Sequence, residues 1–163
     1  MIEADLKSVA NLNATNVKQW EIAGVVLDAT ARIPSGTPAG EVIRFAKVLT
    51  SAVVHGTSAA WVTSAGAGNL KLGFQSFKGA AAGPAAGSTG GTTKDDALNP
   101  GIPLSANAKR LDVIADHTNA GKRVWELMGL EKDPYDWAFV IGTTTAAATA
   151  AGSVTLVLSL HYG

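Results

Sequence analysis

The C-terminal stretch 153–162 reads Ser-Val-Thr-Leu-Val-Leu-Ser-Leu-His-Tyr and alternates apolar with mostly polar residues. In an extended chain Val154, Leu156, Leu158 and Leu160 share one face, and the residues between them share the other. A period of two is typical of a half-buried β-strand whose apolar face packs on a core. The stretch therefore predicts a strand at the end of the chain.

The same strand chemistry recurs upstream, between loops rich in Gly, Pro and Ala. The further strands are expected near 20–33, 41–49, 53–54, 61–63, 69–77, 109–115 and 137–141. Residues 123–128 are interpreted as another strand, with a short helix as the alternative, and 94–101 as a turn punctuated by Pro100 and Gly101.

About eight short strands without a strong internal helix predict an all-β protein, either a single β-sandwich or a jelly roll. The last two strands, joined by a Thr/Ala/Gly segment at 143–152, are interpreted as a hairpin. The segment 79–93 contains no residue larger than Thr apart from one Pro, so we expect a flexible loop within a sandwich domain of residues 20–163.

Residues 1–19 differ from the rest and are expected to form an N-terminal arm. Ile2, Leu6, Val9 and Leu12 recur at helical spacing, which predicts a short helix followed by an extended segment. So short a helix is marginal alone and needs a surface to dock on. The segment either packs on its own domain, docks on a neighbouring subunit or is disordered. Under the docking alternative these four residues and Trp20 are the candidate partner-binding residues.

Composition limits the classes of partner. The 163 residues contain 13 Lys and Arg against 13 Asp and Glu, which leaves no net charge to hold a phosphate backbone and predicts no nucleic-acid partner. No apolar stretch reaches the roughly 20 residues that span a bilayer, so no membrane partner is expected either. Charged residues make up only 16 % of the chain, which suggests a surface covered by an assembly.

The search for chemistry finds no catalytic motif. The chain has no Cys, which excludes a thiolate nucleophile and Cys-ligated metals, and its three His are far apart in the sequence. We therefore expect no catalytic residues, no metal ligands and no cofactor. We expect the large aromatic rings to pack in the core or in an interface. Trp61 and Tyr135 flank predicted loops and are the candidates for the alternative, exposed aromatic contacts with a glycan.

A longer pattern runs through four segments: 41–48 (EVIRFAKV), 69–74 (NLKLGF), 136–142 (DWAFVIG) and 152–162 (GSVTLVLSLHY). This progression of strands resembles small β-sandwich structural proteins of tailed bacteriophages. The resemblance implies a virion protein made in the host cytoplasm and located on the capsid surface. It would be a decoration (cement) protein that binds the major capsid protein and its own copies, often as a trimer, and is not an enzyme.

The alternative left open is a head- or tail-fibre or adaptor domain that recognises a host glycan or joins virion parts. Under the decoration hypothesis, the arm at 1–19 and the segment 79–93 would reach onto neighbouring subunits.

Overall fold

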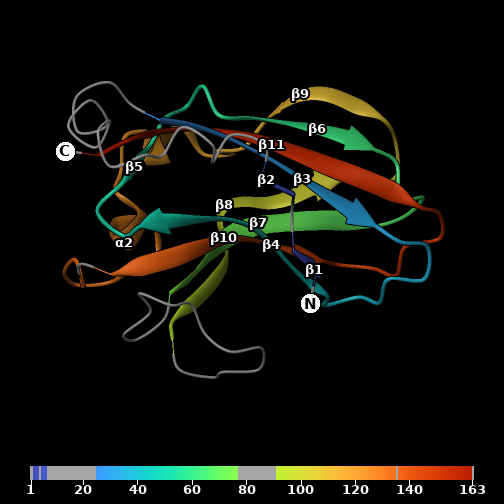
Figure 1. Ribbon diagram of the computed structural model, residues 1–163, viewed down its shortest axis with the longest axis horizontal. Helices are drawn as coiled ribbons and strands as arrows, with labels where there is room; N and C mark the ends of the chain where they lie inside the picture. The colour runs from blue at the N-terminus through green and yellow to red at the C-terminus, as the bar shows by residue number, and fades with distance from the viewer. Residues whose placement is uncertain (1, 4, 7–24, 77–90, 135, 163) are drawn as a thin grey trace.

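A computed structural model describes residues 2–3, 5–6, 25–76, 91–134 and 136–162. Almost all of its regular elements are strands, arranged in two sheets that pack face to face (Figure 1). The elements are β1 (Ile2–Glu3), β2 (Asp5–Leu6), β3 (Val25–Ile33), β4 (Val42–Leu49), β5 (Val53–Val54), β6 (Ala59–Thr63), β7 (Asn69–Ser76), β8 (Thr93–Pro103), β9 (Ala108–Asp112), η3 (His117–Asn119), α2 (Val124–Leu127), β10 (Trp137–Thr144) and β11 (Gly152–His161).

The strand order defines the fold. One sheet has five strands in the order β1-β4-β10-β7-β8, and the other has the order β2-β3-β11-β6-β9 with β5 paired to β11. Each of the links β3–β4, β6–β7, β8–β9 and β10–β11 changes sheet and joins strands at the same position in the two orders. This is the arrangement of a jelly roll. The predicted all-β sandwich is confirmed, and of its two forms the jelly roll is the one adopted.

The expected C-terminal hairpin is wrong. β10 pairs with β4 and β7, whereas β11 pairs with β3 and β6 in the other sheet. The seven-residue connection 145–151 is long enough to cross between the sheets, and each strand lies between two neighbours of its own sheet. Local alternation predicts each strand but says nothing about which sheet it joins.

The expected turn at 94–101 is also wrong, because these residues belong to β8. This strand lies at the edge of its sheet, where a residue without an N–H such as Pro100 interrupts no ladder on its open side. Register shifts against β7 accommodate it. Residues 123–128 form the alternative helix α2, in which the Glu126 carboxylate accepts a hydrogen bond from the Arg123 backbone N–H at 2.7 Å.

The core lies between the sheets and is built from alternate residues of their strands. Val154, Leu156, Leu158 and Leu160 are all at most 1 % exposed, as the C-terminal alternation predicts. On the core side of the five-stranded sheet, the large aromatic side chains include Phe45 of β4 and Phe74 of β7, both at most 2 % exposed. The large apolar side chains are therefore concentrated at inward strand positions, where each removes much surface from water.

Gly142 on β10 has no room for a side chain. A Cβ atom there would stand 2.9 Å from both the Phe45 ring and a Leu70 methyl group in the core. Gly142→Ala should therefore lower the free energy of unfolding by about 1–3 kcal/mol through overpacking, measured by urea denaturation. The control Gly56→Ala places its Cβ 3.5 Å from Ala120, an ordinary contact, and should not destabilise. Equal stability of the Gly142 variant and the wild type would contradict this account of the core.

Candidate interaction surfaces

Four loops that change sheet lie together at one end of the sandwich, here called the crossover end: 34–41, 64–68, 104–107 and 145–151 (Figure 1). Backbone hydrogen bonds join each loop to the next. Gly36 donates to Ala148 at 2.8 Å, Thr149 to Ala65 at 3.0 Å, and Ala65 to Leu104 at 2.9 Å. The four loops therefore form one connected layer, although they are up to about a hundred residues apart in the sequence.

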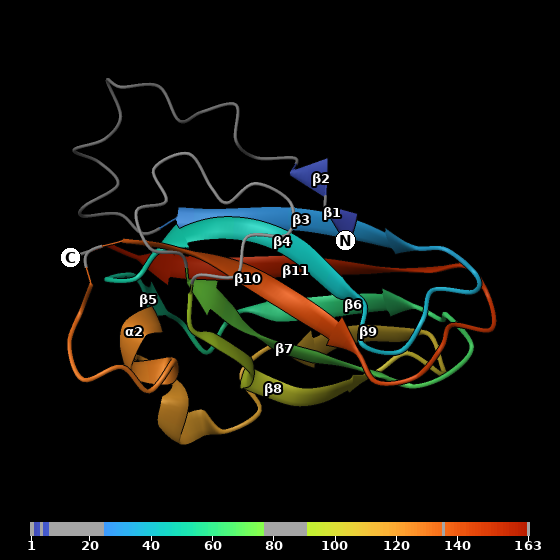
Figure 2. The same cartoon turned by 90° about the horizontal axis from the view of Figure 1, so that it is seen from below.

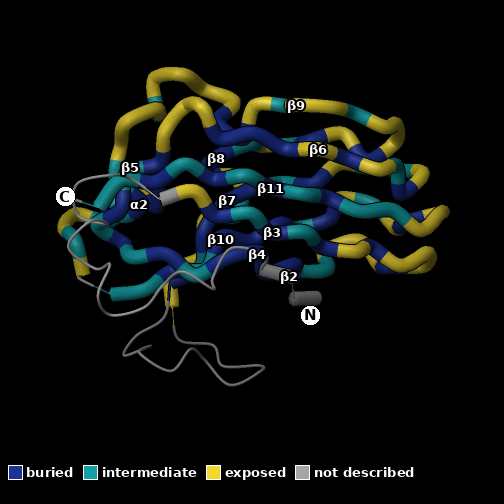
Figure 3. The backbone as a smooth tube through the Cα atoms, turned by 45° about the horizontal axis from the view of Figure 1, so that its top comes forward, coloured by how far each residue is buried: buried dark blue, intermediate teal, exposed yellow. Residues whose placement is uncertain are grey.

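Small side chains allow this close approach. Gly66 has a φ of +88°, and a Cβ atom there would collide with the Thr149 side chain. Asn107 adds a side-chain bond, since its Oδ1 accepts from the Ser64 backbone N–H at 2.8 Å. The exposed residues of this end are mostly small, namely Ala, Gly, Ser and Thr, together with Pro34, Pro38 and Asn107. Figure 3 shows these loops largely exposed.

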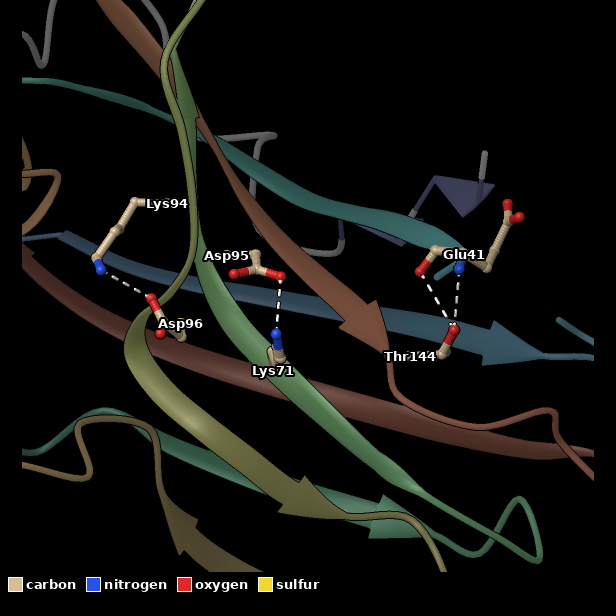
Figure 4. A network of polar contacts seen from close by, with 6 residues as sticks. All are labelled: Glu41, Lys71, Lys94, Asp95, Asp96 and Thr144. Atoms are coloured by element: carbon tan, nitrogen blue, oxygen red, sulfur yellow. Dashed lines mark hydrogen bonds and ion pairs between the residues drawn. The ribbon is translucent and has the colours of Figure 1, made fainter. Parts of the chain in front are cut away.

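Thr144 ties the end of β10 to the loop 34–41. Its hydroxyl donates to the Pro38 carbonyl at 2.8 Å. It also accepts from the Glu41 backbone N–H at 3.0 Å (Figure 4). The side chain is only 3 % exposed, so both bonds are shielded from water. A buried hydroxyl with satisfied bonds in this place fixes the geometry of the loop.

Charge is distributed unevenly between the two ends of the sandwich. The four loops of the crossover end contain 24 residues, and Glu41 is the one charged residue among them. The segment 113–136, which covers the opposite end, also has 24 residues and carries eight Asp, Glu, Lys or Arg. The loops of the crossover end are therefore nearly uncharged, whereas the segment 113–136 is rich in charge.

The opposite end contains the two clear pKa shifts among the described residues. The Asp116 carboxylate accepts hydrogen bonds from the Thr118 hydroxyl and backbone N–H, which lower the pKa of Asp116. Burial raises the pKa of Tyr162 to about 12, and a backbone hydrogen bond with Leu49 acts in the opposite direction. The first is a capping interaction of η3 and the second a consequence of packing, so neither defines a reactive group.

The outer face of the six-stranded sheet is the second surface. Trp61 on β6 is 36 % exposed and lies opposite Thr155 of β11, which in turn lies opposite Thr30 of β3. The hydroxyls of Thr30 and Thr155 are 2.8 Å apart and hydrogen-bonded. Val26, at the start of β3, is 58 % exposed on the same face. An aromatic ring beside a row of hydroxyls makes this face amphipathic.

The outer face of the five-stranded sheet has a different character. Its cations are held against aromatic rings or acids: the Arg44 guanidinium lies 4.6 Å from the centre of the Phe139 ring, and the Lys47 ammonium 5.1 Å from the Trp137 ring. Lys71 forms an ion pair with Asp95 at 3.3 Å (Figure 4). The charges of this face are thus engaged within the chain.

The candidate partner-binding residues fall partly within the described chain. Ile2 lies in β1 and Leu6 in β2, so the predicted short helix is wrong at these two positions. The physical reason is that a helix this short is only marginally stable, whereas backbone groups at the edges of β4 and β3 pair with β1 and β2. Val9, Leu12 and Trp20 lie outside the described residues, as do Tyr135 and residues 79–90 of the segment 79–93.

Of the two alternatives for Trp61, the structure shows an exposed ring and not a buried one, and it lies on a sheet face within β6. Sequence reasoning missed Val26. Since Leu27 points into the core, the alternation of β3 already places Val26 on the outer face. No local sequence pattern predicted the crossover end as a surface, because its residues come from four separate loops.

Comparison of the chain with protein-family models, with curated proteins and with solved structures finds no match. Among the described residues, no three His, Asp or Glu side chains lie close enough together to hold a metal ion. The described part of the chain likewise has no helix that is both long and apolar enough to cross a membrane.

Thr144→Val tests whether the crossover end is held together as described. The change keeps the shape of the side chain and removes both hydroxyl bonds, so the free energy of unfolding should fall by about 1–3 kcal/mol in urea denaturation. Thr63→Val, at an exposed position of β6, is the matched control and should stay within about 0.5 kcal/mol of the wild type. If both variants unfold alike, the hydroxyl of Thr144 does not hold the loop.

Proposed function

We propose that this chain is a structural protein of a tailed-bacteriophage virion, a decoration (cement) protein that binds the lattice of the major capsid protein and reinforces the head. It would act as a homotrimer on the capsid surface after synthesis in the host cytoplasm. The proposal treats the molecule as a binding scaffold and not as an enzyme, with no cofactor. It starts from the sequence resemblance, and the distribution of charge supplies its main physical support.

The observation that carries the proposal is the nearly uncharged crossover end. A surface with one charge in 24 residues pays little desolvation cost when a flat protein surface covers it. Because hydrogen bonds between the loops already fix their positions, little conformational entropy is lost on binding. The charged opposite end would then face solvent and keep the particle soluble.

The jelly-roll topology agrees with this role, since the same architecture is used by many viral capsid domains. The architecture alone is shared by proteins of unrelated function and carries less weight than the surface.

A charge placed on the crossover end tests the proposal. In a phage that encodes this chain, quantitative mass spectrometry of purified virions should find hundreds of copies of the wild-type protein. The variant Ala147→Asp, at an exposed position of the loop 145–151, should lower this occupancy at least tenfold, because a buried unpaired carboxylate opposes docking. The matched control Ala120→Asp, exposed at the opposite end, should leave it unchanged.

Two results would overturn the proposal. A dozen or fewer wild-type copies per virion would indicate a tail or connector component. Full occupancy by the Ala147 variant would show that the crossover end does not face the capsid.

The second candidate function is a fibre or adaptor domain that recognises a host glycan, and the exposed ring of Trp61 favours it. An aromatic ring beside the hydroxyls of Thr155 and Thr30 offers both a stacking surface and hydrogen-bond partners for a sugar. If this is the function, binding on a glycan array is expected and should be lost in Trp61→Ala, while the control Val26→Ala on the same face keeps it. Absence of any bound glycan would remove this candidate.

A further inference from the structure

The two open sides of the sandwich differ in how they resist the addition of a further strand. On one side β8 and β9 are the last strands of their sheets. β8 carries Pro100 and Pro103, and both strands have register shifts against their neighbours. Charged residues line this side: Lys94, Asp95, Asp96, Lys109, Arg110 and Asp112. Proline, bulges and charge are the features by which proteins block edge pairing.

The other side accepts strands. Here β1 pairs in parallel with β4, with Ile2 opposite Ile43, and β2 pairs antiparallel with β3, with Leu6 opposite Ala29 (Figure 2). Residues 2–6 thus add one short strand to each sheet at the β3/β4 side. Each added strand is only two residues long, so its pairing within one chain is weak.

The connection between the added strands and the sandwich is much longer than it needs to be. Leu6 lies opposite Ala29, so Val25 is only four residues further along β3, about 13 Å, and one strand spacing of about 5 Å to the side. Residues 7–24 provide 18 residues for this path, which can span up to about 60 Å when extended. A domain of this length is roughly 40 Å across, so the connection can reach a neighbouring copy.

We propose that residues 2–6 are exchanged between copies of this chain, so that β1 and β2 of one copy lie on β4 and β3 of the next in the same register. Exchange recreates the same hydrogen bonds, and its cost is therefore mainly the entropy of association. The contact runs from one copy to the next in a single direction and closes into a ring when the rotation permits. The inference stands on the pairing and chain length alone and does not depend on the proposed function.

A cysteine pair tests the exchange, since the chain has no cysteine of its own. Asp5 and Thr30 lie directly opposite each other in the β2–β3 pairing, so Asp5→Cys and Thr30→Cys in one chain place two thiols within reach of a disulfide. After mild oxidation at high protein concentration, non-reducing gel electrophoresis should show covalently linked oligomers, which dithiothreitol should reduce to single chains. A linked monomer, 2 Da lighter by intact mass, or the absence of any disulfide would overturn the exchange.

Two controls separate exchange from random oxidation. Asp5→Cys combined with Thr155→Cys places the second thiol one strand further away, about 10 Å, and should form no disulfide. The single variants Asp5→Cys and Thr30→Cys, mixed after separate purification, can join only between chains and should give a mixed dimer.

Light scattering supplies a test without cysteine. Deletion of residues 2–6 should convert the oligomer to a monomer. A wild-type protein that is already monomeric would contradict the inference.

Discussion

The hydrogen-bonded layer of crossover loops is the constraint on which the rest of the molecule depends. Ala65 is its centre: its N–H donates to Leu104, and its carbonyl accepts from Thr149 and Ala150. Each loop carries the chain from one sheet to the other, so joining the loops also fixes the two sheets relative to each other. The inward side chains of both sheets can then meet in one core.

This layer accounts for part of the 29 Ala and 18 Gly in the 163 residues, since its four loops contain 9 Ala and 4 Gly. Backbones that lie within hydrogen-bond distance across several loops leave space only for small side chains, as Gly66 beside Thr149 illustrates. The same requirement applies in the core, where Gly142 makes room for the Phe45 ring. Small residues therefore serve close packing here, while the volume of the core comes from Val, Leu, Ile and Phe.

The surfaces of the described residues divide into regions of different chemistry. The β8/β9 side and the segment 113–136 are charged and suited to water. The crossover end is rigid and nearly uncharged, and the β3/β4 side pairs with added strands. These last two surfaces therefore differ from the charged regions in both charge and backbone pairing.

The sequence by itself determined the class of fold and most of the strands, because side-chain alternation is a local property that an inward-facing strand must satisfy. It placed Leu156 and Leu158 in the core, but it did not decide whether Trp61 is buried or exposed. It could not assign strands to sheets, and so it mistook the β10–β11 crossover for a hairpin, the edge strand β8 for a turn, and Ile2 and Leu6 for helix. Only the tertiary structure assembled the crossover end, because four loops far apart in the chain become one surface through backbone hydrogen bonds, which leave no trace in side-chain pattern.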